Sequence, residues 1–205
     1  TGLHMRAYTP KDVRDAVARA FAHFSSQRPR PAYLEIPLDL LKQPAGEGWE
    51  PRGLPRVASP SRSQIEEAIA KLNAAHKPLI ILGGGALHAG AAALAIAERL
   101  KAPIITTTAG KGAVPSDHPL CLGYVMGREG VWRLLRESDA ILCAGSELSE
   151  TDFWNDEVVI DKNLIRIDID PSVMSRPHSA DIAILGDARE ALELIAKGVT
   201  DKKGK

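Results

Sequence analysis

From residue 63 onward, short runs of consecutive apolar residues alternate with segments in which apolar residues recur every three or four positions. Strands buried on both faces of a parallel sheet have this continuous apolar character, and the spacing between the runs is typical of helices. We expect strands at residues 79–82, 104–107, 140–143, 164–168 and 182–184, and helices at residues 63–75, 89–100, 130–137 and 188–197. Their alternation indicates right-handed strand–helix–strand units. The pattern therefore predicts an α/β fold, a doubly wound, Rossmann-like parallel sheet, over residues 63–198.

The residues before this domain divide into two parts. Residues 1–42 run straight into one helix, which Thr9 and Pro10 can begin, followed by one strand at residues 32–36. That is too little apolar sequence to bury a core alone. Residues 43–62 hold four prolines and three glycines without an apolar period, so we expect a linker there. Residues 199–205 are predicted to form a solvated tail.

Composition excludes several classes of function. The 26 basic and 26 acidic residues balance, so no net charge attracts nucleic acid or an anionic membrane. None of the six histidines belongs to an HxxxH or HExxH motif, and we assign no metal site and no catalytic residue. No apolar run approaches the ~20 residues of a membrane span. Cys121 and Cys143 lie in apolar sequence, so we expect two buried, reduced thiols and a cytoplasmic protein.

The first segment that could carry chemistry is a glycine triplet. Gly83, Gly84 and Gly85 directly follow a predicted buried strand and precede a helix. Glycines at this position let backbone N–H groups approach a phosphate at a helix N-terminus. They equally suit a tight strand-to-helix turn that binds nothing, and the spacing is not that of a GxGxxG motif. The triplet alone leaves both interpretations open.

Polar residues also follow the other predicted strands. Asp168 and Asp170 end the run IRIDID before Pro171, where one of them could hold a ribose hydroxyl or Asp170 could cap the turn. Gly145 follows the strand at residues 140–143, and the next residues are acidic, which disfavours a pyrophosphate. Because the carboxyl ends of parallel strands share one edge of a sheet, these residues define a candidate ligand site.

Five sequence blocks, in order, resemble thiamine-diphosphate-dependent enzymes of the acetolactate synthase and benzoylformate decarboxylase superfamily. The segment RPRPAYLEIPLDLL at residues 28–41 resembles the end of their pyrimidine-binding domain. The remaining blocks resemble their central domain: the glycine triplet, GKGAVPSDHPLCLG at residues 110–123, IRIDIDP at residues 165–171, and Gly186-Asp187. The resemblance covers nearly the whole chain.

The resemblance implies a parent protein with three α/β domains. Thiamine diphosphate and Mg²⁺ would lie between the pyrimidine-binding and pyrophosphate-binding domains of a homo-oligomer, and the family's activating glutamate and GDG motif are not found in this sequence. Residues 1–42 would be the tail of the pyrimidine-binding domain. The chain would then be a central-domain fragment of a 2-oxo acid decarboxylase or an acetolactate-synthase-like carboligase, a scaffold that is not catalytic alone and whose partners are the two missing domains.

The resemblance also bears on a second cofactor. Acetohydroxyacid synthases bind FAD in this domain, oxalyl-CoA decarboxylases bind ADP, and several decarboxylases bind nothing. Where FAD-binding members carry an arginine, this chain has Glu147, and the reversed charge disfavours a pyrophosphate. A vestigial FAD or ADP site would use the residues that match the family's motifs: Gly83, Gly84, Gly85, Thr107, Thr108, Gly145, Asp168, Asp170 and Asp187.

Two alternatives compete with this interpretation. A non-enzymatic nucleotide-binding or assembly module would be physically similar to an isolated central domain. A free-standing NAD(P)-binding oxidoreductase requires GxGxxG and an acidic residue about 20 positions later. The chain lacks that motif and has no acid at residues 103–106, so the oxidoreductase is disfavoured.

Overall fold

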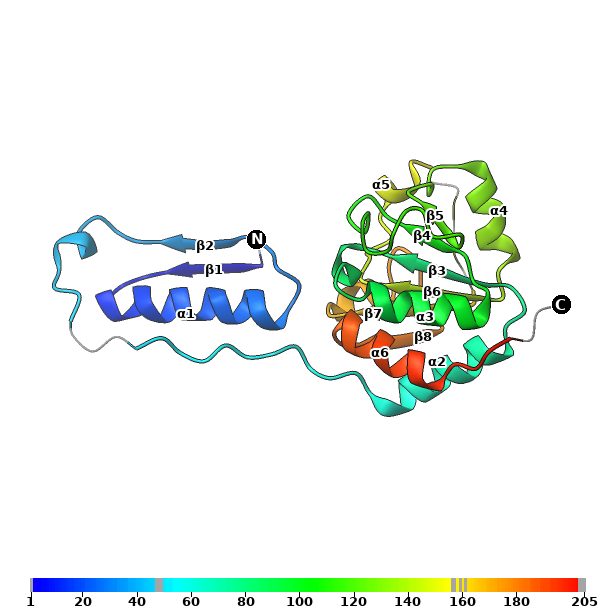
Figure 1. Cartoon of the computed structure of the whole chain (residues 1–205). Coiled ribbons are helices and arrows are strands. Elements are labelled where there is room, and N and C mark those ends of the chain that lie inside the picture. Colours follow the sequence, from blue (N-terminus) through cyan, green and yellow to red (C-terminus); the bar gives the residue numbers. More distant parts are fainter. Residues whose placement is uncertain (1, 47–49, 156–157, 159, 161, 203–205) are drawn as a thin grey trace. The chain divides into compact units, whose positions relative to one another are not determined.

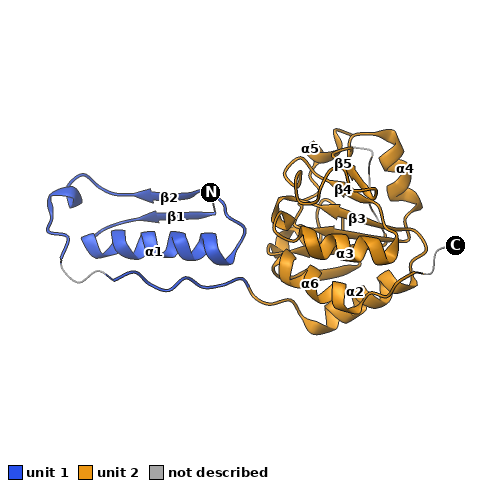
Figure 2. Ribbon diagram, viewed as in Figure 1, with its two compact units in different colours: residues 1–57 blue, residues 58–205 orange. Residues whose placement is uncertain are grey.

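The computed structural model describes residues 2–46, 50–155, 158, 160 and 162–202. The chain divides into two compact units, residues 1–57 and residues 58–205 (Figure 2). The division falls inside the segment predicted as a linker, of which residues 47–49 lie outside the described residues. Among the described residues, none of the helices combines the length and the apolar character needed to cross a membrane.

The first unit is a small strand–helix–strand arrangement. Strands β1 (Leu3–Arg6) and β2 (Ala32–Glu35) pair in parallel, and α1 (Pro10–Ser26) connects them. Thr9 caps α1 as predicted, in a capping box with Asp12. The expectation that the chain runs straight into this helix is wrong, because β1 precedes it. Four residues of alternating burial give a weak signal, and the pairing with β2 is what orders them as a strand.

The second unit contains a six-stranded sheet in which each pair of neighbouring strands is parallel, in the order β5-β4-β3-β6-β7-β8. This confirms the predicted fold class. The strands are β3 (Pro78–Leu82), β4 (Ile104–Thr106), β5 (Cys121–Gly123), β6 (Ala140–Ala144), β7 (Leu164–Asp168) and β8 (Ile182–Leu185). The helices are α2 (Arg62–Ala74), α3 (Gly90–Leu100), α4 (Glu129–Glu137), α5 (Glu150–Phe153) and α6 (Ala188–Gly198).

Helices cover both faces of this sheet (Figure 1). One core cluster joins buried residues of α2, α3 and α6 to one face, and the second joins α4 and α5 to the other. Every residue of β3, β6 and β7 is buried, which explains why β3 and β6 are continuous apolar runs. β7 is equally buried although it contains Arg166 and Asp168. Fully burying each leucine or isoleucine contributes roughly 1.5–3 kcal/mol, so the buried strands contribute strongly to the folding of this unit.

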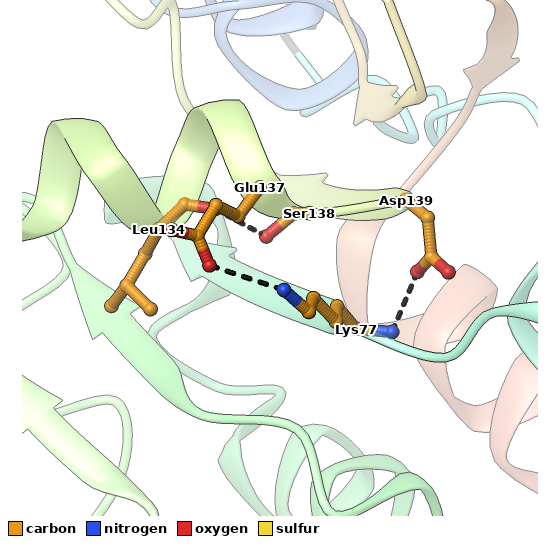
Figure 3. A network of polar contacts seen from close by, with 5 residues as sticks. All are labelled: Lys77, Leu134, Glu137, Ser138 and Asp139. Atoms are coloured by element: carbon orange, nitrogen blue, oxygen red, sulfur yellow. Dashed lines mark hydrogen bonds and ion pairs between the residues drawn. The ribbon is translucent and has the colours of Figure 1, made fainter.

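A polar network fixes the amino edge of the sheet (Figure 3). The carboxylate of Asp139 accepts hydrogen bonds from the backbone N–H of His76, at 2.6 Å, and of Lys77, at 2.8 Å. The ammonium of Lys77 lies 3.1 Å from Glu137, and the Ser138 hydroxyl donates to the carbonyl of Leu134 at 2.6 Å. The contacts of Asp139 and Glu137 join the turn before β6 to the turn before β3, and the two strands that follow pair with Pro78 opposite Ala140.

Three features of the second unit differ from the sequence-based expectation. The sequence predicts no strand between residues 107 and 140, yet Cys121 begins β5, an edge strand too short to show a pattern. Cys121 is also only half-buried, whereas Cys143 is buried as expected. The expected tail is packed as far as it is described: Val199 is buried, and the N–H of Lys202 donates to the carbonyl of Arg99 at 2.9 Å. Residues 203–205 of that tail lie outside the described residues.

Candidate functional site

The candidate site lies where the direction of chain winding reverses. From β3 the chain continues to β4 on one side, and from β6 it continues to β7 on the other, so the neighbours β3 and β6 flank the switch point. Open α/β sheets bind ligands beyond the carboxyl ends of strands at this point. All nine predicted residues lie at the carboxyl edge. They follow or end five strands: Gly83, Gly84 and Gly85 after β3, Thr107 and Thr108 after β4, Gly145 after β6, Asp168 and Asp170 at β7, and Asp187 after β8.

Two of the three N–H groups of the glycine triplet, and the N–H of Ala86, donate hydrogen bonds within the protein. The N–H of Gly83 donates to the carbonyl of Ala144 at 2.9 Å, and the N–H of Gly85 donates to the carbonyl of Gly145 at 3.0 Å. The N–H of Ala86 donates to the carbonyl of Gly83 at 3.0 Å. To take part in an anion cradle, these three groups would have to give up those bonds and turn toward a phosphate. Their geometry instead favours the tight-turn interpretation of the triplet.

The glycines are required by the contact between the two loops. Gly145 has a φ of +65°, and a β-carbon on it would lie 2.6 Å from the α-carbon of Gly85. A β-carbon on Gly85 would lie 2.9 Å from the α-carbon of Gly145, and one on Gly83 would collide with the carbonyl oxygen of Gly145. The protein's own backbone therefore occupies the close approach that glycines would otherwise offer to a ligand.

The threonines after β4 play different parts. Thr107 is buried, and its hydroxyl accepts a hydrogen bond from the N–H of Gly110 at 3.1 Å, while Thr108 is exposed. Thr106, the last residue of β4, has a buried hydroxyl with no hydrogen-bond partner among the described residues. At this hydroxyl a water or a ligand atom would gain a bond.

The predicted aspartates serve the local backbone. Asp168 is buried, and its Oδ1 accepts from the N–H of Asp170 at 2.9 Å. Asp170 accepts from the N–H of Ser172 at 2.9 Å and so caps the 3-10 helix Pro171–Met174, which confirms the capping interpretation. Asp187 caps α6 by accepting from the N–H of Glu190 at 3.0 Å. A nucleotide that used these carboxylates would have to compete with the caps.

The residue that organises this edge is Arg166, which our sequence reasoning did not select. Its side chain is 1% exposed. One guanidinium nitrogen donates to the carbonyls of His178, at 2.8 Å, and Arg176, at 3.2 Å, and the other donates to those of Ser146, at 2.9 Å, and Glu147, at 3.0 Å. An arginine in the middle of a predicted buried strand was the available signal, because arginine is rarely fully buried without partners.

The titratable groups around Arg166 are shifted mainly by burial. Burial raises the pKa of the Cys143 thiol to about 12, although the nearby Arg166 opposes the shift. Burial, and then Arg166, lower the pKa of His178, whose Nδ1 accepts from the N–H of Ile160 at 3.1 Å. Burial also raises the pKa of Asp152, which lies 3.5 Å from the Ser146 hydroxyl. A thiol with this pKa is a poor nucleophile at neutral pH.

Comparison with known proteins places this arrangement in a family. Residues 65–195 match the family described as thiamine pyrophosphate enzyme, central domain. The chain is 39% identical over 197 residues to the protein named "Probable 2-ketoarginine decarboxylase AruI" of Pseudomonas aeruginosa, covering 95% of this chain and 35% of that protein. It is 31% identical over 192 residues to the acetolactate synthase large subunit of Corynebacterium glutamicum, covering 89% of this chain and 31% of that protein.

A solved structure supports the fold. The benzoylformate decarboxylase of Polynucleobacter necessarius superposes with a TM-score of 0.81 at 23% identity, over 98% of this chain and 39% of that chain. The chain thus spans 31–39% of the length of these proteins. With its parallel sheet, its glycine-lined switch point and the match over residues 65–195, the chain belongs to the thiamine pyrophosphate enzymes and carries their central domain.

Proposed function

We propose that this chain is the central part of a thiamine-diphosphate-dependent enzyme that acts on a 2-oxo acid, and that its second unit serves that enzyme as a structural domain. The relatives named above support this proposal, since one is named as a decarboxylase and the other as an acetolactate synthase. The higher identity to the decarboxylase, 39% against 31%, favours decarboxylation over carboligation.

The observation that best supports a structural role is the packing of the glycine triplet against the loop after β6. The N–H groups of Gly83 and Gly85 donate to the loop after β6, and Gly145 fills the space beside them. Glu147, on the same loop, adds a negative charge where a pyrophosphate would need a positive one. FAD does not fit the described residues in this arrangement. We therefore propose a vestigial nucleotide site whose glycines now serve loop packing.

The cofactors of the chemistry belong, in this proposal, to the rest of a longer parent. The resemblance assigns thiamine diphosphate and Mg²⁺ to the pyrimidine-binding and pyrophosphate-binding domains, and residues 1–42 would be the tail of the former. Among the described residues, His, Cys, Asp and Glu side chains form no group of three or more that could hold a metal ion. We further propose a homo-oligomeric parent in the cytoplasm, the compartment that the free cysteines favour.

A ligand-binding experiment tests the structural role. The chain is melted alone, with FAD and with ADP, each up to millimolar concentration, beside an FAD-binding acetolactate synthase as positive control. A ligand at 100 times its Kd would add about 2.7 kcal/mol of stability and a clear rise in Tm. We expect no shift with either nucleotide. A saturable rise in Tm with FAD or ADP would show that the nucleotide site is functional and would overturn the scaffold role.

An activity measurement tests the parent reaction separately. The complete enzyme, supplied with thiamine diphosphate and Mg²⁺, is expected to release CO₂ from a 2-oxo acid, and 2-ketoarginine and pyruvate are the first substrates to compare. The 205-residue chain alone is expected to release none under the same conditions. CO₂ release by the chain alone would contradict its role as a non-catalytic part.

A further inference from the structure

The loop after β6 is held from one side by a single buried side chain. We define the β6 loop as residues 145–148 and the pre-β8 segment as residues 176–178. The guanidinium of Arg166 bonds to two carbonyls in each of them, at distances from 2.8 to 3.2 Å. The planar guanidinium fork suits such paired acceptors, which an ammonium group could not satisfy together.

The β6 loop needs such support because its backbone is strained. Leu148 has a φ of +50°, a left-handed conformation that a branched, non-glycine residue adopts at a cost. Its side chain is buried in the same core cluster as Cys143 and Phe153. Residues in such conformations persist where surrounding contacts hold them, and the carbonyls of Ser146 and Glu147 lie just before Leu148 in the grip of Arg166.

The same loop packs against the glycine triplet at the switch point. Gly145 packs against Gly85, and its carbonyl accepts a hydrogen bond from the N–H of Gly85. The N–H of Gly145 donates to the carbonyl of Ile167 at 2.8 Å. We propose that Arg166 is a latch: its bonds to the β6 loop keep that loop packed on the glycine triplet, and without these bonds the loop separates from the triplet locally while the sheet stays folded. This conformational device is independent of whether a nucleotide binds.

The chain contains a reporter for this opening. Cys143 lies opposite Arg166 in the pairing of β6 with β7, and it is 1% exposed. Its thiol shares a core cluster with Leu148, so lifting the β6 loop would uncover it. With a pKa of about 12 in the closed state, the thiol reacts with a disulfide reagent only after opening.

The test measures thiol modification in a Cys121→Ser background, so that Cys143 is the single reactive group. The rate of reaction with 5,5′-dithiobis(2-nitrobenzoate) is compared for the parent chain, Arg166→Lys and Arg166→Met. We expect Arg166→Met to react at least about tenfold faster without denaturant, because hydrogen bonds to a charged group are lost. Arg166→Lys should lie between the two.

A control separates local opening from global instability. Leu192→Ala removes a buried side chain of α6 in the cluster on the opposite face, so it should accelerate labelling only through global unfolding. The rate of labelling through global unfolding rises steeply with urea concentration. Local opening exposes little surface, so the rate of labelling through it is nearly independent of urea at low concentration. An Arg166→Met rate that equals the parent rate, or that shows the steep urea dependence of Leu192→Ala, would overturn the proposal.

A second measurement needs no substitution at Arg166. In native-state hydrogen exchange on the unaltered chain, the amides of Gly85 and Gly145 should exchange through a shared opening of low denaturant dependence. The amides of β3 should exchange only through global unfolding. If Gly85 and Gly145 exchange with the same free energy and denaturant dependence as β3, the β6 loop does not open locally and the latch is disproved.

Discussion

Gly85 and Gly145 pack backbone against backbone, with the N–H of Gly85 donating to the carbonyl of Gly145 at 3.0 Å and no room for a β-carbon on either residue. The contact lies at the switch point of the sheet, where related folds place a ligand. In this chain, the same glycines join two loops of the protein to each other. The pairing accounts for the glycine-rich turn without a bound ligand, in keeping with the structural role that we propose for this domain.

Substituting Gly145 with alanine should therefore destabilise the second unit in two ways. The left-handed φ of +65° costs about 1 kcal/mol for a non-glycine residue, and the collision with Gly85 adds roughly 1–3 kcal/mol of overpacking. Gly123→Ala is the matched control, since Gly123 has a similar φ of +72° but nothing within 4 Å of a β-carbon. Urea denaturation should show a clearly larger loss for Gly145→Ala. Equal losses would mean that the loop contact is easily relaxed.

The sequence predicted the buried strands well, because strands that are buried on both faces consist mainly of consecutive apolar residues. It missed β1 and β5, which are three or four residues long and which depend on pairing with a neighbour. Because each of the nine candidate residues ends or follows a predicted parallel strand, the sequence also indicated that they lie at one edge of the sheet. It could not show that Arg166 organises this edge, because the acceptors of its guanidinium are backbone carbonyls, which any residue type supplies.

The role of Asp187 as a helix cap predicts a specific pattern of substitutions. Asp187→Ala should destabilise the second unit by about 1 kcal/mol, because the N–H of Glu190 loses its acceptor. Asp187→Ser should retain most of that stability, because a serine hydroxyl can accept the same bond. Both variants are compared with the parent chain by thermal and urea denaturation. If serine were as damaging as alanine, the carboxylate would have a role other than capping.

Asp139, at the amino edge of the sheet, should make the stability of the second unit depend on pH in the acidic range. Burial by itself raises the pKa of Asp139, but the hydrogen bonds from the N–H groups of His76 and Lys77 outweigh it and leave the pKa below its usual value. The folded state then favours the carboxylate, so its contribution is present above about pH 4 and is lost as pH falls through the folded pKa.

Asp139→Asn should thus cost about 1 kcal/mol at pH 7, and the difference from the parent should shrink as pH falls below about 4. Urea midpoints of the two proteins at pH 7, 5, 4 and 3 measure this. Glu137→Gln is a suitable comparison, since Glu137 makes an exposed ion pair with Lys77 that should contribute little at any pH. A penalty for Asp139→Asn that persists at pH 3 would show that the charge of the carboxylate is not involved.

His178 gives a second pH dependence, in a different range. Its pKa lies below the usual value because the ring is buried and faces Arg166, and its Nδ1 must stay unprotonated to accept from the N–H of Ile160. The unfolded chain therefore binds a proton more readily, and stability should fall as pH drops below about 6.5 toward the folded pKa.

His178→Asn keeps an acceptor oxygen near the position of Nδ1 but cannot titrate. Between pH 7.5 and 5, the urea midpoint of the parent should fall more than that of the variant, a window that Asp139 does not enter. Parallel profiles for the two proteins would show that protonated His178 is accommodated beside Arg166, and the ring would then have no part in holding the pre-β8 segment.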